Sequence, residues 1–209
     1  MHLTGGAPAT EMKGPESDDL DLVRSAARGD GRAFHELVDR HAPRLYRMAV
    51  SLCGNAADAE DVLQEAFTGA YRGLARFEAR SSVKTWLSRI LVTQAALWRR
   101  RGRSRRDVLP LTSLTRTDEE GGELPVPAPG PGPAAEVDYR IDLRAALQTL
   151  SPDHREVVTL REIDGLSYEE IARVLGVPRG TVESRLHRAR AELRERLKAY
   201  RPAQAPKQA

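Results

Sequence analysis

Nine residues near the middle of this 209-residue chain, 125–133, read Pro-Val-Pro-Ala-Pro-Gly-Pro-Gly-Pro. Proline lacks a backbone N–H and its ring clashes with the preceding turn, so this run can form neither a helix nor a central strand. Further proline, glycine and acidic residues extend the segment over 107–136. We therefore expect a flexible linker of about 30 residues that separates two folding units.

The composition divides the rest of the chain as well. Residues 1–17 and 201–209 are rich in proline, alanine and other small or polar residues without periodicity, and we expect them to be disordered tails. Between them we expect a first domain at 18–100, a linker at 101–137 that is first arginine-rich and then Pro/Gly-rich, and a second domain at 138–200.

In the first domain, apolar residues recur every three or four positions, which is the spacing of amphipathic helices. Gly54 should end the second helix, and Pro43 should bend or divide it. No window alternates as a strand would, so the expected fold class is all-α. The four expected helices lie around 20–27, 34–52 and 62–74, and after a cap at Ser81 or Ser82, with Val83, Trp86, Leu87, Ile90 and Leu97 on the buried side of the fourth.

The second domain has sharper helix signals. Helices are expected at 139–150 and at 152–164, the latter with Ser151 as N-cap and Pro152 in its first position. Ser167 and Glu170 form a capping box before a short helix at 168–175, which stops at Gly176. A long last helix follows from Pro178 to residue 200. A short helix, a glycine turn and a crossing helix predict a helix-turn-helix.

The last helix carries a local excess of positive charge near its start. In a helix-turn-helix the second helix enters the DNA major groove with its N-terminal residues facing the bases. Mixed charges on a helix more often mark a solvated face, and that interpretation fits 190–198, where the signs alternate. It fits 179–188 poorly, because Glu183 is the only acid there. The expected DNA contacts are Arg179, Thr181, Ser184, Arg185 and Arg188.

Two charge clusters distinguish the first domain. Four acids fall within residues 58–65 without a base, and the helix dipole explains only the first two or three of them. The expected docking face for a basic partner comprises Asp58, Glu60, Asp61, Gln64 and Glu65. Six arginines fall within 99–106, next to Trp98. A solvated tail is the usual meaning of such a run, but beside a helix and a tryptophan it suits the nucleic-acid backbone.

Several classes of protein are disfavoured. His35 and His41 lie off a common helix face, so a metal pair is not expected, and no nucleophilic triad or phosphate loop occurs. Cys53 lies among apolar residues, where we expect a buried thiol in a reducing compartment. No signal peptide precedes the helices, and the uncharged stretch 90–98 is too short to span a bilayer, so we expect a cytoplasmic protein without metal, cofactor or catalysis.

The motifs resemble those of a known family. Asp58-Ala-Glu-Asp-Val-Leu-Gln-Glu-Ala-Phe67, Phe77, and Ser82-Val-Lys-Thr-Trp-Leu-Ser-Arg-Ile90 resemble region 2 of the bacterial extracytoplasmic-function sigma factors. Leu150-Ser-Pro152, with Arg155 and Glu156 after it, and the run from Gly180 to Arg190 resemble region 4 of the same family.

The resemblance implies a transcription initiation factor that brings core RNA polymerase to promoter DNA. By it, the acidic face docks on the clamp helices of the polymerase's largest subunit, the flap is a further contact, and region 4 reads the −35 element. The presence of an anti-sigma partner stays open. The residues implied at the −10 element and the DNA backbone are Arg76, Arg80, Ser82, Lys84, Arg89, Thr93, Trp98, Arg99, Arg100 and Arg101.

One departure and two alternatives accompany this interpretation. Thr93 and Leu97 stand where relatives usually carry Asn and Asp, which leaves the −10 preference open. A stand-alone helix-turn-helix regulator would use its first domain to sense a signal or to dimerise, and would bind a palindromic site unaided. A helical RNA-binding or nucleic-acid-processing protein would need catalytic residues or stacking aromatics that the sequence lacks.

Overall fold

The structure is a computed structural model that describes residues 15–108 and 143–197, with the backbone alone at 15–17 and 103–108. Every regular element in these two ranges is helical, which confirms the all-α prediction. The two expected tails and most of the expected linker lie outside the described residues.

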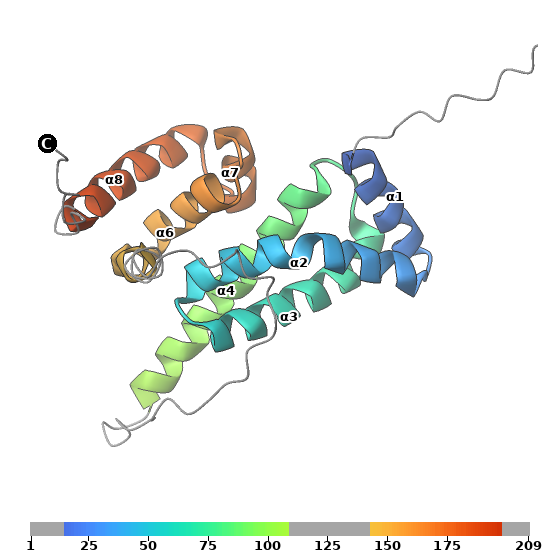
Figure 1. The fold of residues 1–209 in the computed structure, drawn as a ribbon, viewed down its shortest axis with the longest axis horizontal. Helices are drawn as coiled ribbons and strands as arrows, with labels where there is room; N and C mark the ends of the chain where they lie inside the picture. Colours follow the sequence, from blue (N-terminus) through green and yellow to red (C-terminus); the bar gives the residue numbers. More distant parts are fainter. Residues whose placement is uncertain (1–14, 109–142, 198–209) are drawn as a thin grey trace, which may run out of the picture.

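The first domain consists of four helices and one short turn of 3₁₀ helix (Figure 1). They are α1 (Pro15–Ala27), α2 (Gly31–Cys53), α3 (Ala56–Gly73), η1 (Leu74–Arg76) and α4 (Val83–Val108). The four predicted helices are therefore present and in order. The second domain contains a helical stretch at 143–149, α6 (Pro152–Val158), a π-helical turn η2 (Thr159–Ile163), α7 (Tyr168–Leu175) and α8 (Arg179–Leu197).

Local signals explain most of the helix boundaries. Asp30 and Asn55 cap α2 and α3 by accepting backbone N–H groups, and the Ser82 hydroxyl accepts the Thr85 N–H at the start of α4. Gly54 ends α2 with a φ of 91°, a left-handed conformation that glycine adopts without strain. The capping box of Ser167 and Glu170 is present as predicted.

The helices depart from the expectation in three places. α2 continues through Pro43 as a single helix, so this proline does not divide it. α4 runs on to Val108, eight residues beyond the expected end of the first domain, because arginine favours helix and the next proline is Pro110. The expected helix at 152–164 is α6 followed by the π turn η2, which accommodates one residue more per turn.

The buried apolar side chains form one cluster that runs through both domains. In the first domain it lies where α2, α3 and α4 meet, and in the second where α6 and α7 pack on α8. The largest fully buried side chains are Leu37, Leu45, Met48, Leu87 and Leu91 in the first domain, and Leu160, Leu166, Ile171, Val182 and Leu186 in the second.

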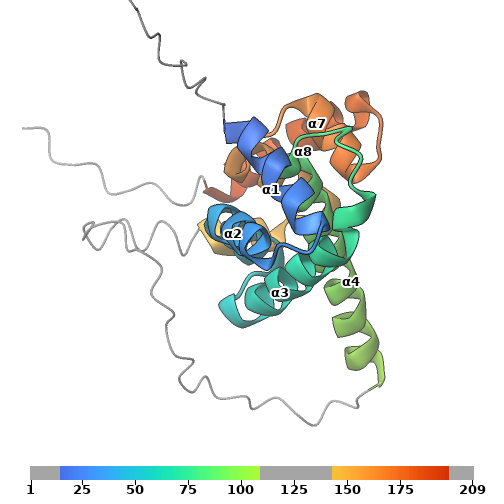
Figure 2. The same cartoon turned by 90° about the vertical axis from the view of Figure 1, so that its right-hand side faces the viewer.

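The two domains also pack against each other. Figures 1 and 2 show the second domain along one side of α2 and α4, while α3 lies on the other side of the first domain. The contacts run from η2 and α6 to α2, and from α7 to α4. This contact was not expected from the sequence, which suggested two domains joined only by a linker.

Candidate nucleic-acid interface

The acidic cluster lies along the outer side of α3. Glu60, Asp61, Gln64 and Glu65 are exposed, and within the described residues none of their side chains makes a hydrogen bond or an ion pair. Asp58 differs, because it is half-buried and its carboxylate and backbone both bond to the capping residue Asn55. Four of the five predicted docking residues therefore form a solvated surface with unbalanced negative charge.

Tyr71 extends this surface and was missed in the sequence. It follows Gln64 by seven residues, which places the two on the same side of α3 two turns apart. Its side chain is 56% exposed and meets the Phe34 ring edge-on, with 5.0 Å between the ring centroids. The heptad spacing from Gln64 was the available signal, but spacing alone does not reveal exposure.

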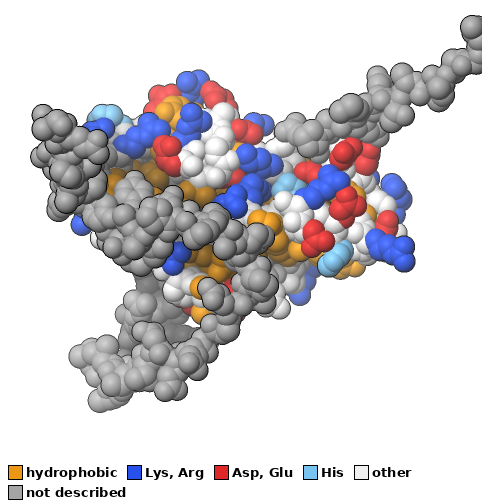
Figure 3. Space-filling view, viewed as in Figure 1, with side chains coloured by type: hydrophobic (Ala, Val, Ile, Leu, Met, Phe, Trp, Pro, Cys, Tyr) orange, Lys and Arg blue, Asp and Glu red, His pale blue; other side chains and the backbone are white. Residues whose placement is uncertain are grey.

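On α1 and α2, by contrast, acids and bases form ion pairs with each other. Arg40 of α2 bonds to both Glu36 and Asp19. Figure 3 shows positive and negative side chains side by side over α1 and α2 and over the helix-turn-helix. The unpaired acids of α3 therefore contrast with the ion-paired surface of α1 and α2.

The loop between η1 and α4 carries the first of the residues implied at the −10 element. Arg76 and Arg80 are exposed, and Arg80 pairs with Glu78 at 2.6 Å. Phe77 packs on Trp86 with 4.7 Å between the ring centroids, which fixes the loop to α4. Trp86 is half-buried against the core, as the sequence indicated.

The solvent-facing side of α4 carries four more of these residues, namely Arg89, Thr93, Arg100 and Arg101. The Thr93 hydroxyl donates to the Arg89 carbonyl at 2.8 Å. Lys84 and Trp98 are half-buried, and Trp98 packs against the core. Leu97 was expected on the buried side but is 38% exposed, at the edge of a hollow between α4 and the second domain.

Arg99 is engaged by the second domain. Its guanidinium donates to the Glu156 carboxylate of α6 at 3.1 Å, and the two side chains are only 26% and 12% exposed. Burial raises the pKa of the Glu156 carboxyl, and the hydrogen bond from Arg99 opposes that rise. Arg99 is thus held away from solvent, unlike its neighbour Arg100.

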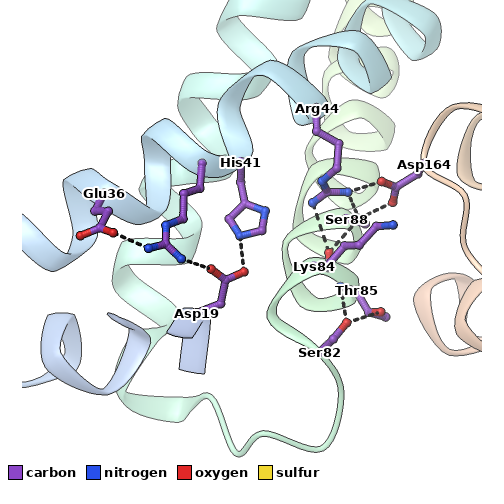
Figure 4. Close-up of polar contacts among 10 residues, drawn as sticks. Asp19, Glu36, His41, Arg44, Ser82, Lys84, Thr85, Ser88 and Asp164 are labelled. Atoms are coloured by element: carbon purple, nitrogen blue, oxygen red, sulfur yellow. Dashed lines mark hydrogen bonds and ion pairs between the residues drawn. The ribbon is translucent and has the colours of Figure 1, made fainter. Parts of the chain in front are cut away.

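A buried polar network joins the domains at one point. Figure 4 shows the Arg44 guanidinium reaching from α2 to Asp164, which follows η2 in the second domain. The Ser88 hydroxyl of α4 donates to the same carboxylate at 2.7 Å, and Arg44 donates to Ser88 at 3.0 Å and to the Lys84 carbonyl at 3.4 Å. The Asp164 side chain is fully buried. One carboxylate thereby binds two helices of the other domain.

Two hydroxyl contacts flank this network. The Thr85 hydroxyl of α4 donates to Glu170 of α7 at 3.1 Å, and Ser51 of α2 bonds to Thr159 of η2 at 2.8 Å. Thr85, Ser88, Ser51 and Thr159 are all buried. We call the set of contacts made by Arg44, Ser51, Thr85, Ser88 and Arg99 with the second domain the interdomain seam.

The seam continues at the C-terminal end of α2. The last carbonyls of a helix have no partner within it, and α2 has no basic residue in its own last turn. The second domain provides the donors, because Arg155 bonds to the Leu52 carbonyl at 3.0 Å and Gln148 to the Ser51 carbonyl at 2.9 Å. The end of a helix in one domain is therefore capped by side chains of the other.

The helix-turn-helix presents part of the predicted set to solvent. Arg179, Ser184 and Arg188 are exposed on α8, whereas Thr181 and Arg185 are half-buried. Arg179 pairs with Glu169 at 2.6 Å and with Glu183 at 2.9 Å. Arg185 pairs with Asp153 of α6. His187, which the sequence analysis did not single out, is exposed beside Ser184 and Arg188.

Two family models match the two domains separately. Residues 37–106 match "Sigma-70 region 2", and residues 140–193 match "Sigma-70, region 4". The chain belongs to the sigma-70 family. Relatives in this family place it in the extracytoplasmic-function (ECF) group, as the sequence motifs indicated.

Among the curated sigma factors, three span organisms from different genera. The ECF sigma factor SigE of Mycolicibacterium smegmatis is 42% identical, over 82% of this chain and 65% of SigE. The sigma-H factor of Pseudomonas aeruginosa is 37% identical, over 87% of this chain and 95% of that protein. The sigma-E factor of Escherichia coli is 38% identical, over 82% of this chain and 90% of that protein.

Solved structures agree with this assignment. The structure of CnrH with the cytosolic domain of CnrY matches with a TM-score of 0.63 and 30% identity, over 87% of this chain and 98% of the other. The sigma factor RpoE of Bartonella quintana, in complex with the anti-sigma factor NepR, matches with a TM-score of 0.60 and 32% identity, over 80% of this chain and 98% of the other. This sigma factor is a transcription initiation factor that directs RNA polymerase to promoters.

In 15–108 and 143–197 no helix is long and apolar enough to cross a membrane. Within the same ranges no group of three or more His, Cys, Asp or Glu side chains is arranged to hold a metal ion.

Proposed function

We propose that three surfaces of this sigma factor divide the work of initiation. The acidic side of α3 docks on core RNA polymerase, the loop at 76–82 with the outer side of α4 contacts the −10 element, and the start of α8 reads the −35 element. The observation that carries this proposal is the unpaired acidic surface of α3, on the same chain as a helix-turn-helix with exposed arginine.

The α3 surface suits a basic helical partner. Glu60, Asp61 and Glu65 have no cation of their own among the described residues, so a partner's lysines and arginines gain contacts without displacing existing ones. Tyr71 adds an exposed aromatic ring at the end of the same side, and tyrosine is enriched where interfaces contribute most to binding. In the resembling family this partner is the clamp-helix pair of the largest polymerase subunit.

On α8, the proposed base-contacting side chains differ in their exposure to solvent and in their ion pairs. Ser184 and Arg188 face solvent one turn apart with His187 beside them, and arginine can bond to both acceptors of a guanine edge. Arg179 is exposed but bonded to two glutamates, and Arg185 is bonded to Asp153. Contact of either of these with DNA requires exchange of a carboxylate for a base or phosphate, so we assign Arg188 the leading role in discrimination.

The proposed binding of polymerase and DNA bears on catalysis, cellular location and further partners. A protein whose surfaces bind polymerase and DNA needs no catalytic group, and we propose that it performs no chemistry and acts in the bacterial cytoplasm, where polymerase and promoters are. We also propose that a protein of the anti-sigma class is among its partners, because RpoE is bound to one in the structure that resembles this chain.

The test is in vitro transcription with core RNA polymerase, combined with co-purification. The double variant Asp61→Lys, Glu65→Lys should lose polymerase binding and transcription while keeping its helical content. The control is Glu36→Lys, Asp39→Lys, which makes the same charge change on exposed acids of α2 that are paired with Arg40 and His35, and it should bind as the unmodified protein does. Equal binding by both double variants would refute the docking surface. Failure of the unmodified chain to support any promoter-dependent transcript would refute the function itself.

A further inference from the structure

The first helix of the helix-turn-helix, α7, carries a single basic residue, Arg173. Its side chain is exposed, and among the described residues its guanidinium has no hydrogen-bond or ion-pair partner. Three neighbouring arginines of region 4 differ from it because each is ion-paired, namely Arg179, Arg185 and Arg190. Arg173 is therefore a positive charge at the surface of region 4 that no acid of the described chain neutralises.

The acids that could pair with Arg173 within α7 are bonded elsewhere. A glutamate four residues before an arginine is well placed for an ion pair on a helix, and Glu169 holds that position. Its carboxylate instead bonds to Arg179 at the start of α8, at 2.6 Å. Glu170, the other acid of α7, is held by the capping box and by the Thr85 hydroxyl. Both acids of α7 are thus engaged, and neither neutralises Arg173.

The side of α7 that carries Arg173 borders the start of α8. Residues four apart lie one above the other on a helix, so Arg173 and Glu169 share one side of α7. That side faces solvent, because Ile171 and Val174 are buried on the opposite one. The ion pair of Glu169 with Arg179 joins it to the first turn of α8, and the two side chains are 56% and 60% exposed. Figure 1 shows α7 and α8 next to each other in region 4.

The position of α7 in a helix-turn-helix favours a phosphate as the partner of this charge. When the second helix enters the major groove, the first helix crosses the DNA backbone. The start of α7 carries Glu169 and Glu170, whose negative charge opposes a phosphate there. Arg173 lies one turn further along and is the cation that this helix offers. A guanidinium binds a phosphate through two parallel hydrogen bonds, which fix orientation as well as distance.

We propose that Arg173 binds a backbone phosphate beside the −35 element and thereby positions α8 in the major groove, without reading sequence itself. This inference rests on the proposed role of α8 at the −35 element. Two exposed arginines without an ion pair in the described chain then have different tasks, since Arg188 on α8 contacts base edges and Arg173 on α7 contacts the backbone. Phosphate contacts set the register of a protein on the duplex, whereas base contacts set its sequence preference.

The first test measures how the affinity of the holoenzyme for promoter DNA depends on salt. The holoenzyme is formed from core RNA polymerase and the full chain, and the probe is a promoter duplex that the unmodified holoenzyme selects from a randomised library. Arg173→Gln should make the slope of log affinity against log salt shallower by about 0.9, so that about 3-fold less affinity is lost between about 50 and 200 mM salt. Relative affinities for single-base variants of the −35 element should stay the same, whereas Arg188→Gln should change them.

Two further variants serve as controls. Arg173→Lys keeps the positive charge and should retain the salt slope of the unmodified protein. Arg144→Gln makes the same charge change at another exposed arginine that has no ion pair in the described ranges. Arg144 belongs to the helical stretch 143–149, whose Gln148 bonds to the end of α2, so its replacement should leave the slope unchanged. Helical content and co-purification with core polymerase are measured on every variant and should not change.

The second test locates the contact on the DNA. A methylphosphonate group replaces one phosphate at a time along both strands of the −35 element and removes its charge. We expect one or two positions to weaken binding of the unmodified holoenzyme and to have no effect on the Arg173→Gln holoenzyme, while the other sensitive positions remain sensitive in both.

The outcomes separate the phosphate contact from the proposed function. Identical sensitive positions in the two holoenzymes would refute the contact of Arg173 and leave the reading of the −35 element by α8 standing. If neither a phosphate nor a base of this element affected the unmodified holoenzyme, the role of α8 itself would be refuted. Loss of polymerase co-purification in Arg173→Gln, with an unchanged salt slope, would assign Arg173 to polymerase and overturn the proposal.

Discussion

The interior of each region is apolar, whereas the contact between the regions adds a buried polar network to apolar packing. Inside region 2, α2 and α4 meet through Leu37, Met48 and Leu91, which are fully buried and aliphatic. Across the seam, the same two helices meet region 4 through a guanidinium, hydroxyls and backbone carbonyls, beside apolar side chains that belong to one cluster with those of region 4. The same pair of helices therefore has one apolar interface and one interface that combines polar and apolar contacts.

Apolar burial and hydrogen bonds contribute differently to the stability of this protein. Burying hydrocarbon contributes about 25 cal/mol per Å², and this is lost entirely if the surface returns to water. A hydrogen bond within a protein contributes only about 0.5–1.5 kcal/mol net, since water replaces it when it breaks. We therefore expect each polar contact between the regions to contribute less to the free energy of unfolding than a large buried side chain within either region.

The largest expected loss of stability comes from a cavity in the apolar core of region 2. Leu37→Ala should lower the free energy of unfolding of region 2 by about 2–5 kcal/mol, because Leu37 is fully buried. Denaturant unfolding followed by circular dichroism measures it. Leu97→Ala on α4 is the control, because that side chain is 38% exposed. A change of similar size in both variants would mean that the apolar core is not what holds region 2 together.

A smaller effect is expected from the capping box of the helix-turn-helix. The Ser167 side chain accepts the Glu170 N–H, and Glu170 in turn accepts the Ser167 N–H. Ser167→Ala should destabilise region 4 by about 0.5–2 kcal/mol and leave region 2 unchanged. Hydrogen exchange resolved by region provides the measurement. Equal loss of protection in both regions would indicate that the contact between the regions couples their stabilities.

The hydroxyl pair of the seam should have a still smaller effect. Ser51→Ala removes one bond between α2 and Thr159. The free energy of unfolding should fall by about 0.5–1.5 kcal/mol, the net value of a single hydrogen bond. Denaturant unfolding followed by circular dichroism measures this change. Unfolding of region 2 in the same variant would show instead that Ser51 belongs to the core rather than to the seam.

The smallest expected effect is a shallow pH dependence within region 2. His41 is 8% exposed and bonds to Asp19 of α1 at 2.7 Å, with Arg40 and Arg44 nearby. Burial lowers the pKa of the His41 imidazole, and Asp19 opposes this shift. The unfolded chain therefore binds the proton more readily, so stability falls as pH drops through histidine's ordinary pKa of about 6.5.

Replacing the imidazole tests this assignment. The His41→Gln variant should flatten the slope of stability against pH between about 7 and 5, whereas the exposed His35→Gln should not. Thermal unfolding at several pH values measures both slopes. A slope that survives in His41→Gln would assign the dependence to another group.

The sequence predicted the features that depend on neighbours along the chain. Caps at Ser151 and Ser167, the turn at Gly176 and the helical periods are local, and all are present. Pro43 shows the limit of local rules, because packing of α2 along both sides outweighs the one hydrogen bond that this proline removes.

The seam was not predictable in this way. Arg44 and Asp164 are 120 residues apart, and each is an ordinary charged residue in its own helix or turn. The exposure of the α3 acids agreed with expectation, but the pairing of Arg99 and Arg185 did not follow from charge runs. Whether an arginine is ion-paired depends on acidic residues that are distant in the sequence and that only the tertiary structure brings close to it.

The cap on the end of α2 has a consequence for how this protein can evolve. The groups that region 2 offers there are the carbonyl oxygens of Ser51 and Leu52, and no substitution at these positions removes a main-chain carbonyl. At this part of the contact, only substitutions of the donor residues, Gln148 and Arg155, can remove the hydrogen bonds. Arg155 also binds the carbonyls of Leu147, Gln148 and Leu150, so changing it alters region 4 as well. The Gln148 side chain accepts only one bond within region 4, from Arg155, so substitution at Gln148 changes this contact with the smaller loss of bonds inside region 4.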